Sequence, residues 1–505
     1  MSTTSPKSPA RPGRVSGPGR CGPGPALAAA LLGFFVITLD ALVVNVALPA
    51  IGGGLGVGMT GLQWVVDGYT LLFAALLLSA GSLSDRFGAR QAFGAGMLLF
   101  ALASAACGLA PTLGVLVAAR LVQGAGAAVI VPSSLALIRE AYPDSGPRAR
   151  AISLWALGGA VGSAAGPVAG GLLSLVSWRM IFFVNLPVAV AALALLARTA
   201  RSPRRPAPFD ATGQVAAVVA MGALTYVAIE AGAAGPTAPR VLAALTLAVV
   251  AAAVFLAVQA FGAHPMVPLA LLRSRTMALS AVIGFALNIG FYGMIFLLSL
   301  YLQQARGLTA LATGLAFLPM TLLTAFVSPQ AARLSARFGS RLPVITGQIT
   351  MALGLLLLTL PGAAAPTWLL IVLMIPVGAG GALTVPALTA MLLDHVPADQ
   401  AGIAGGVLNT SRQVGGALAV AAFGALVADR AHFLSGLRTS LLIAAAAIAA
   451  TTAAALLLKP SSAFATPTGR GHDGVAARDP SDARDPSDAS DSPRTLEPSR
   501  ARHKA

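Results

Sequence analysis

An aspartate stands in the middle of the first long apolar segment of the chain. Asp40 lies within LLGFFVITLDALVVNVALP, a run long enough to span a bilayer. A carboxylate at that depth costs roughly 2.5–3.5 kcal/mol on insertion scales, and such residues usually face a bundle interior or a water-filled cavity. We expect Asp40 to take up and release protons near neutral pH. The alternative is a carboxylate fixed by hydrogen bonds for packing.

Two further polar features accompany Asp40 within apolar segments. Arg120, in RLVQGAGAA, is an intramembrane charge that needs a partner or a cavity, and Asp40 is the candidate partner. In the segment after residue 276, aromatic and polar residues step by three or four and share one helix face: Phe285, Asn288, Tyr292, Phe296 and Ser299. That face suits a lipophilic ligand, although packing is an equally good explanation.

The composition indicates an integral membrane protein. The chain is 56% hydrophobic and 10% charged, whereas soluble domains carry about 25% charged residues. The net charge of +16 is scattered through short loops, with no basic helix interleaved with aromatics, so nucleic-acid binding is excluded. No P-loop, HExxH, GxSxG or metal-ligand cluster occurs, so we expect neither an enzyme nor a metal or cofactor site.

Apolar runs predict an all-α protein with fourteen membrane-spanning helices. The expected spans are 27–49, 63–83, 91–110, 112–138, 150–175, 180–197, 213–231, 240–261, 277–303, 310–330, 343–361, 367–393, 405–428 and 436–458. The first is too long for a signal-peptide core and reads as a helix that stays in the membrane. Lys and Arg concentrate in alternate connections, which predicts that both termini are cytoplasmic.

The sequence repeats itself in the two halves of the chain. LSDRFGAR from Leu83 returns as LSARFGSR from Leu334, and GAGAAVIVP from Gly124 returns as GAGGALTVP from Gly378, at nearly the same offset. Helices 1–6 therefore correspond to helices 9–14. The predicted organisation comprises an N-terminal tail 1–26, a six-helix bundle 27–197, a central linker with two helices 198–276, a second six-helix bundle 277–458, and a tail 459–505. Both tails are expected to be disordered.

These motifs together resemble the major facilitator superfamily, and specifically its 14-helix drug/proton antiporter branch (EmrB/QacA type). LDALVVNVALPAI from Leu39 is similar to that branch's first-helix motif, and GSLSDRFGAR is similar to the superfamily's loop 2–3 signature. The residues that the resemblance assigns to a conformational latch are Gly81, Asp85, Arg86, Gly88 and Arg90. Those of the antiporter signature are Gly162, Gly166, Pro167, Gly170 and Gly171. The second-half copy of the latch has Ala336 in place of the acid.

The resemblance implies a major facilitator fold and a proton-coupled exporter of drug- or antibiotic-like lipophilic compounds, working by alternating access. Asp40 and Arg120 would couple protons. Asp67, in QWVVDGYTL, would recognise cationic substrate beside Asn288, Tyr292 and Phe296, unless Asp67 is an interfacial residue that reaches water. The alternatives are a dedicated exporter of one endogenous metabolite and, less favoured, a non-transporting membrane sensor.

The expected partners follow from this interpretation. They are a small-molecule substrate, protons and the lipid bilayer of a bacterial inner membrane, with the proton gradient rather than a cofactor as the energy source. For the oligomeric state, a monomer is favoured.

Overall fold

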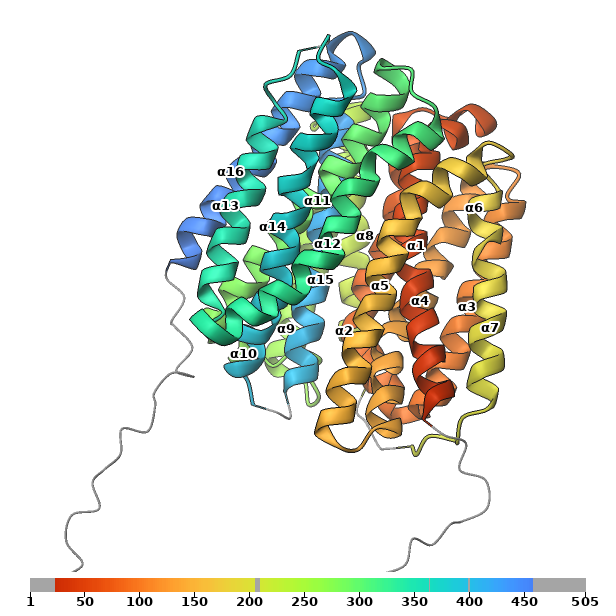
Figure 1. Ribbon diagram of the computed structural model, residues 1–505, viewed down its shortest axis with the longest axis vertical. Coiled ribbons are helices and arrows are strands. Elements are labelled where there is room, and N and C mark those ends of the chain that lie inside the picture. Colours follow the sequence, from red (N-terminus) through yellow and green to blue (C-terminus); the bar gives the residue numbers. More distant parts are fainter. Residues whose placement is uncertain (1–22, 205–208, 363, 398–399, 457–505) are drawn as a thin grey trace, which may run out of the picture. The chain divides into compact units, whose positions relative to one another are not determined.

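The computed structural model describes residues 23–204, 209–362, 364–397 and 400–456, and within them all regular structure is helical. The long helices of the first part are α1 (Gly24–Leu55), α2 (Met59–Phe87), α3 (Ala89–Leu109), α4 (Leu113–Ala141), α5 (Ser145–Ser174), α6 (Met180–Phe183) with α7 (Asn185–Ala197), α8 (Ala211–Ala234) and α9 (Pro239–Phe261). Those of the second part are α11 (Arg275–Leu300) with the π-turn Tyr301–Ala305, α12 (Ala310–Phe338), α13 (Arg341–Leu357), α14 (Thr367–Asp394), α15 (Ala401–Leu426) and α16 (Phe433–Ala455). Figure 1 shows their arrangement.

The described helices match the fourteen expected spans in number and order. Twelve are long and apolar enough to cross a bilayer. The other two are α13, which has 17 residues, and α15, which has 26 residues. An unexpected five-residue helix, α10 (Leu269–Arg273), precedes α11.

Several expected helix ends were wrong. α1 begins at Gly24 and continues through Pro49 to Leu55, beyond the expected 27–49. The membrane requires helix only within its hydrocarbon core, and apolar runs therefore underestimate helices that extend past it. The sixth expected span, 180–197, agrees with the structure, where Met180–Ala197 forms one apolar span and the single residue Val184 separates α6 from α7. The predicted tails lie almost wholly outside the described residues.

The same helix pairs pack together in both halves of the chain. In the first half α1 packs on α5, α2 on α4 and α3 on α4. In the second half α11 packs on α15, α12 on α14 and α13 on α14. The repeated turn is also alike, since Gly88 and Gly339 both adopt positive φ, at 90° and 81°, a conformation that glycine adopts without strain. The sequence repeat is thus a repeat of helix packing.

Helices α8 and α9 lie between the two sets and pack on each other. α8 also contacts α2 and α15, one helix from each half. The contacts of α8 with α2 include a hydrogen bond and a ring contact. Gln214 Nε2 of α8 donates to Ala75 O of α2 at 2.9 Å. The ring of Tyr226 on α8 lies beside that of Trp64 on α2, with 6.2 Å between the centroids. α8 is therefore tied to the first half by polar and aromatic contacts.

The two halves meet closely at the end of the bundle where α1 ends and α2 begins, which we term the α1–α2 end. There Ser299 Oγ donates to Asn45 O at 2.7 Å, and Gln63 Nε2 donates to Ala421 O at 2.5 Å. Towards the opposite end, where α2 meets α3, the last described hydrogen bond between the halves runs from Thr410 Oγ1 to Ala74 O, at 3.1 Å. The described polar contacts between the halves thus concentrate at the α1–α2 end.

Candidate functional site

A buried ion pair joins α1 to α4. Arg120 Nη1 lies 2.6 Å from Asp40 Oδ2, and the two residues are 1% and 0% exposed. The Arg120 guanidinium also lies 4.3 Å from the centroid of the Tyr69 ring and donates from Nε to Val65 O at 3.1 Å. The two charges that the sequence singled out are therefore direct partners, and α2 supplies further contacts to the arginine.

Three polar side chains that the sequence analysis missed complete a network around Asp40. Gln123 Nε2 and Asn185 Nδ2 donate to Asp40 Oδ1 at 2.9 Å and 2.8 Å. Asn185 also donates to Ser104 Oγ at 2.9 Å, which brings α3 into the network. Gln123 lies one turn beyond Arg120, a spacing that places both on one face of α4 and that could have been noticed. Asn185 is the first residue of α7, and no motif or charge in the surrounding sequence indicates its role.

A central cavity opens beside this network. Its wall is formed by α1, α2, α4 and α5 from the first half and by α11 and α15 from the second. The empty space, which includes the open mouth, is ≈ 1050 Å³. Arg120 is part of the wall, so the residue that binds Asp40 also borders the cavity. A ligand in the cavity and a proton on Asp40 would both act on this arginine.

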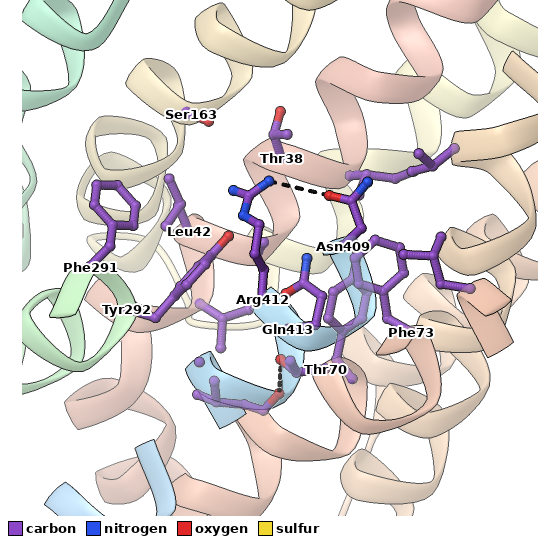
Figure 2. A pocket seen from close by; sticks show the side chains of 18 of the residues that line it. Thr38, Leu42, Thr70, Phe73, Ser163, Phe291, Tyr292, Asn409, Arg412 and Gln413 are labelled. Carbon is purple, nitrogen blue, oxygen red and sulfur yellow. Dashed lines mark hydrogen bonds between the residues drawn. The ribbon is translucent and has the colours of Figure 1, made fainter. Parts of the chain in front are cut away.

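Of the four residues predicted to bind substrate, Tyr292 lines the cavity. Figure 2 shows its ring beside Arg412, below Leu42 and next to Phe291. Asn288 is buried one turn away and accepts a hydrogen bond from Arg412 Nε at 3.4 Å. Phe296 is fully buried and is not part of the cavity wall. The assignment of these residues to substrate binding stays a prediction.

Asp67 lies on α2, fully buried, and is not among the residues of the cavity wall. It follows Gln63 by one helical turn, on the face that meets α15. Neither carboxyl oxygen has a hydrogen-bond partner in the described structure. A buried carboxylate without a partner is strongly disfavoured as an ion, so this environment favours the neutral acid. A role for Asp67 in binding cationic substrate remains a prediction that its position does not support.

The predicted latch lies at the turn between α2 and α3. Asp85 and Arg86 are exposed, and among the described residues neither forms an ion pair. Arg90 is held more firmly: its Nε donates to Leu196 O at 3.2 Å and its backbone N donates to Ser202 Oγ at 2.9 Å. The structure thus places Arg90 against the end of α7, whereas the side chains of Asp85 and Arg86 are exposed. The latch function stays a prediction.

The glycines of the predicted antiporter signature lie against α1. A Cβ at Gly162 would come within 2.4 Å of Phe35 O, and one at Gly170 within 2.6 Å of Val43 O. Gly171 faces the other half, where a Cβ would come within 2.6 Å of Ala310 O on α12. Glycine permits backbones to approach this closely. α5 therefore packs tightly both on the helix that carries Asp40 and on the opposite half.

Two related helical halves around a cavity, with a buried ion pair whose arginine belongs to the cavity wall, are typical of secondary membrane transporters. The chain belongs to the Major Facilitator Superfamily, whose sequence profile matches residues 30–420. It is 39% identical over 400 residues to the multidrug resistance protein Stp of Mycobacterium tuberculosis, covering 79% of this chain and 74% of the relative.

A second relative is the tetracenomycin C resistance and export protein of Streptomyces glaucescens, which is 35% identical over 414 residues, covering 81% of this chain and 76% of that protein. Among solved structures, the fold is similar to that of a bacterial homologue of the human lysosomal transporter Spinster. The TM-score is 0.62 at 17% identity, over 86% of this chain and 96% of that one. The protein is thus a multi-pass member of the superfamily, and these relatives are named for drug and antibiotic resistance.

Proposed function

We propose that the protein is a proton-coupled antiporter that exports drug- or antibiotic-like lipophilic compounds by alternating access. The observation that carries the proposal is the position of Arg120, which borders the central cavity while it binds the buried carboxylate of Asp40 at 2.6 Å. Transport out of the cell is supported by the relatives, which are named as a multidrug resistance protein and as a resistance and export protein.

Coupling would work through the packing of α1 on α4. Protonation of Asp40 removes the negative charge that compensates Arg120, and an uncompensated buried charge is strongly destabilising. The guanidinium would then have to move toward the cavity or toward water. Because Asp40 also binds Gln123 and Asn185, that movement would loosen contacts of α1 with α4 and α7 together. Substrate and proton would therefore influence each other through helix position.

Asp67 is the candidate for a second proton site. Its carboxyl group is buried and has no hydrogen-bond partner in the described structure, one helical turn from Gln63, which bonds to α15. Ionisation would require water, which we expect to reach Asp67 when α2 and α15 separate. A proton on Asp67 would thus favour closure of the α1–α2 end.

The distribution of Lys and Arg supports a bacterial inner-membrane protein with both termini in the cytoplasm. In that orientation the α1–α2 end faces outside, and the structure represents the state that is closed on the outside. This is the state in which a substrate would load from the cytoplasm or from the inner leaflet.

The decisive experiment measures export in proteoliposomes with an imposed pH gradient, using a panel of lipophilic dyes and antibiotics. We expect the gradient to drive movement of several unrelated compounds and the Asp40→Asn variant to lose this dependence. Asp429→Asn is the control, because Asp429 is an exposed loop residue. Undiminished gradient-driven export by Asp40→Asn would refute Asp40 as the coupling site.

A second variant guards against misfolding. Asp40→Asn leaves Arg120 buried without its partner, a change that typically costs about 3–5 kcal/mol. Asp40→Asn/Arg120→Gln removes both charges together and avoids that cost. We expect the double variant to insert stably and still to lack proton coupling.

A further inference from the structure

The wall of the central cavity carries a positive charge that no described carboxylate compensates. Arg412, on α15, lies in the wall beside Tyr292 (Figure 2). Its Nε donates to Asn288 Oδ1 at 3.4 Å and its Nη1 donates to Asn409 Oδ1 at 3.2 Å. Both acceptors are neutral amides. Among the described residues, Arg412 forms no ion pair.

The position of Arg412 is built by its neighbours. The side chain runs along α11 at Gly284, where an added Cβ would lie 2.9 Å from Arg412 Cγ. Arg412 lies roughly 16 Å along α15 from its start, at 1.5 Å per residue. An arginine whose charge simply reaches for water would be expected near a helix end. Here two asparagines and a glycine instead hold the guanidinium in the cavity wall.

The charge balance of the cavity follows from its lining. The charged residues of the described wall are Arg120 and Arg412, and no Asp or Glu belongs to it. Arg120 is compensated by Asp40 at 2.6 Å, just behind the wall. The cavity therefore presents one uncompensated positive charge. An intramembrane charge requires a partner or water, and a ligand can provide the partner.

The surroundings of Arg412 describe the rest of that ligand. Tyr292 and Phe291 contribute aromatic side chains to the wall from α11, and Phe73 and Phe34 contribute them from the first half. The guanidinium has five N–H donors, of which the two asparagines engage two, and its planar fork matches a carboxylate. An acidic group on an aromatic body would satisfy both features.

We propose that the cavity binds lipophilic aromatic compounds that carry an acidic group, with the anion on Arg412 and the ring system against the aromatic side chains of the wall. The proposal rests on the proposed function as an exporter and specifies its substrate class. It differs from the cationic preference that the sequence suggested, because Asp67, the residue assigned to cations, is buried outside the cavity wall.

The test compares three probes with one ring system: 1-pyrenebutyric acid, its primary amide and 1-pyrenebutylamine, which at pH 7 are anionic, neutral and cationic. Binding to the full-length protein in detergent is measured by equilibrium dialysis. We expect the acid to bind about tenfold or more tighter than the amide, and the amine to bind more weakly than the amide. Equal affinities, or a preference for the amine, would overturn the proposal without any variant being needed.

Variants then locate the anion site. Arg412→Gln should lose the preference for the acid while binding the amide as the wild type does, which also reports an intact cavity. Arg412→Lys keeps the charge without the fork and should retain part of the preference. Arg333→Gln, which removes an exposed positive charge elsewhere, should behave as the wild type. A preference that survives Arg412→Gln would contradict the assignment to Arg412.

Transport of the same probes separates this inference from the proposed function. If the acid binds preferentially but a pH gradient moves none of the probes, the preference of the cavity for acidic ligands stands and the antiporter proposal fails. If the gradient moves the amide and the amine while the acid is neither bound nor moved, the antiporter stands and the acidic substrate class is wrong.

Discussion

At the scale of single residues, the Asp40 carboxylate is held by three donors from two directions. Arg120 engages Oδ2, whereas Gln123 and Asn185 engage Oδ1. Each donor restrains the carboxylate, so together they hold α1 against α4 and α7 at this point. The network therefore ties the position of the carboxylate to the packing of three helices.

Replacing Asn185 tests this role. Asn185→Ala removes one donor to Asp40, a loss of about 1.5–3 kcal/mol for a hydrogen bond to a charged group. We expect this loss to loosen α7 from α1 and to lower the rate of gradient-driven export in proteoliposomes. Asn45→Ala is the control, since Asn45 is also buried but donates to Ala41 O. An export rate equal to that of the wild type would show that the Asn185 contact does not contribute to coupling.

The sequence could reveal part of this site. Charges within apolar segments stand out because hydrocarbon penalises them, and an acid and a base in one bundle are natural partners. Asn185 could not be found in this way, because its contact with Asp40 spans 145 positions and depends on how α7 packs against α1. Helical periodicity predicts that Tyr292 and Phe296 share a helix face, but it does not predict how far the cavity extends along that face. Tyr292 lines the cavity and Phe296 does not.

At the scale of secondary-structure elements, α5 makes two close contacts through glycines. Gly162 and Gly170 meet α1, and Gly171, on an adjacent face, meets α12. Glycines spaced by multiples of four residues share one helix face, which suits the close approach of α5 to α1. The contact with α12 could not be predicted, since it depends on how the two halves are placed.

A methyl group at Gly162 should disturb the α1–α5 contact. The added Cβ would come within 2.3 Å of Thr38 Oγ1, and overpacking of this kind typically costs about 1–3 kcal/mol. We expect Gly162→Ala to lower the thermal unfolding midpoint in detergent and to impair export. Gly146→Ala, on the same helix with open space around it, should not lower the midpoint. Equal behaviour of the two variants would mean that α1 and α5 have room to separate.

At the scale of the whole molecule, the described polar contacts between the halves concentrate at the α1–α2 end. A further contact between the halves, of α12 with α5, requires a glycine. A Cβ at Gly314 on α12 would come within 2.2 Å of Pro167 O on α5. Gly314→Ala should therefore destabilise the closed end and favour the opposite conformation. In hydrogen-exchange measurements, the ends of α5 and α12 that meet there should exchange faster than in the wild type.

The matched control for that measurement is Gly381→Ala, on α14, where an added Cβ has open space. It should leave the exchange of the closed end unchanged. Slower or unaltered exchange in Gly314→Ala would indicate that this contact does not limit opening.

The polarity of α15 has a consequence for how the protein is made. This helix supplies Asn409, Arg412 and Gln413 to the cavity, and although it has 26 residues it is not one of the twelve apolar candidates for a membrane span. Such a segment should partition poorly from the ribosomal exit into lipid by itself, unlike the strongly apolar α9. We expect an isolated α15 segment to fail in a glycosylation-based insertion assay that α9 passes. Biogenesis would then depend on earlier helices, above all α2 and α11, waiting at the translocon to receive it.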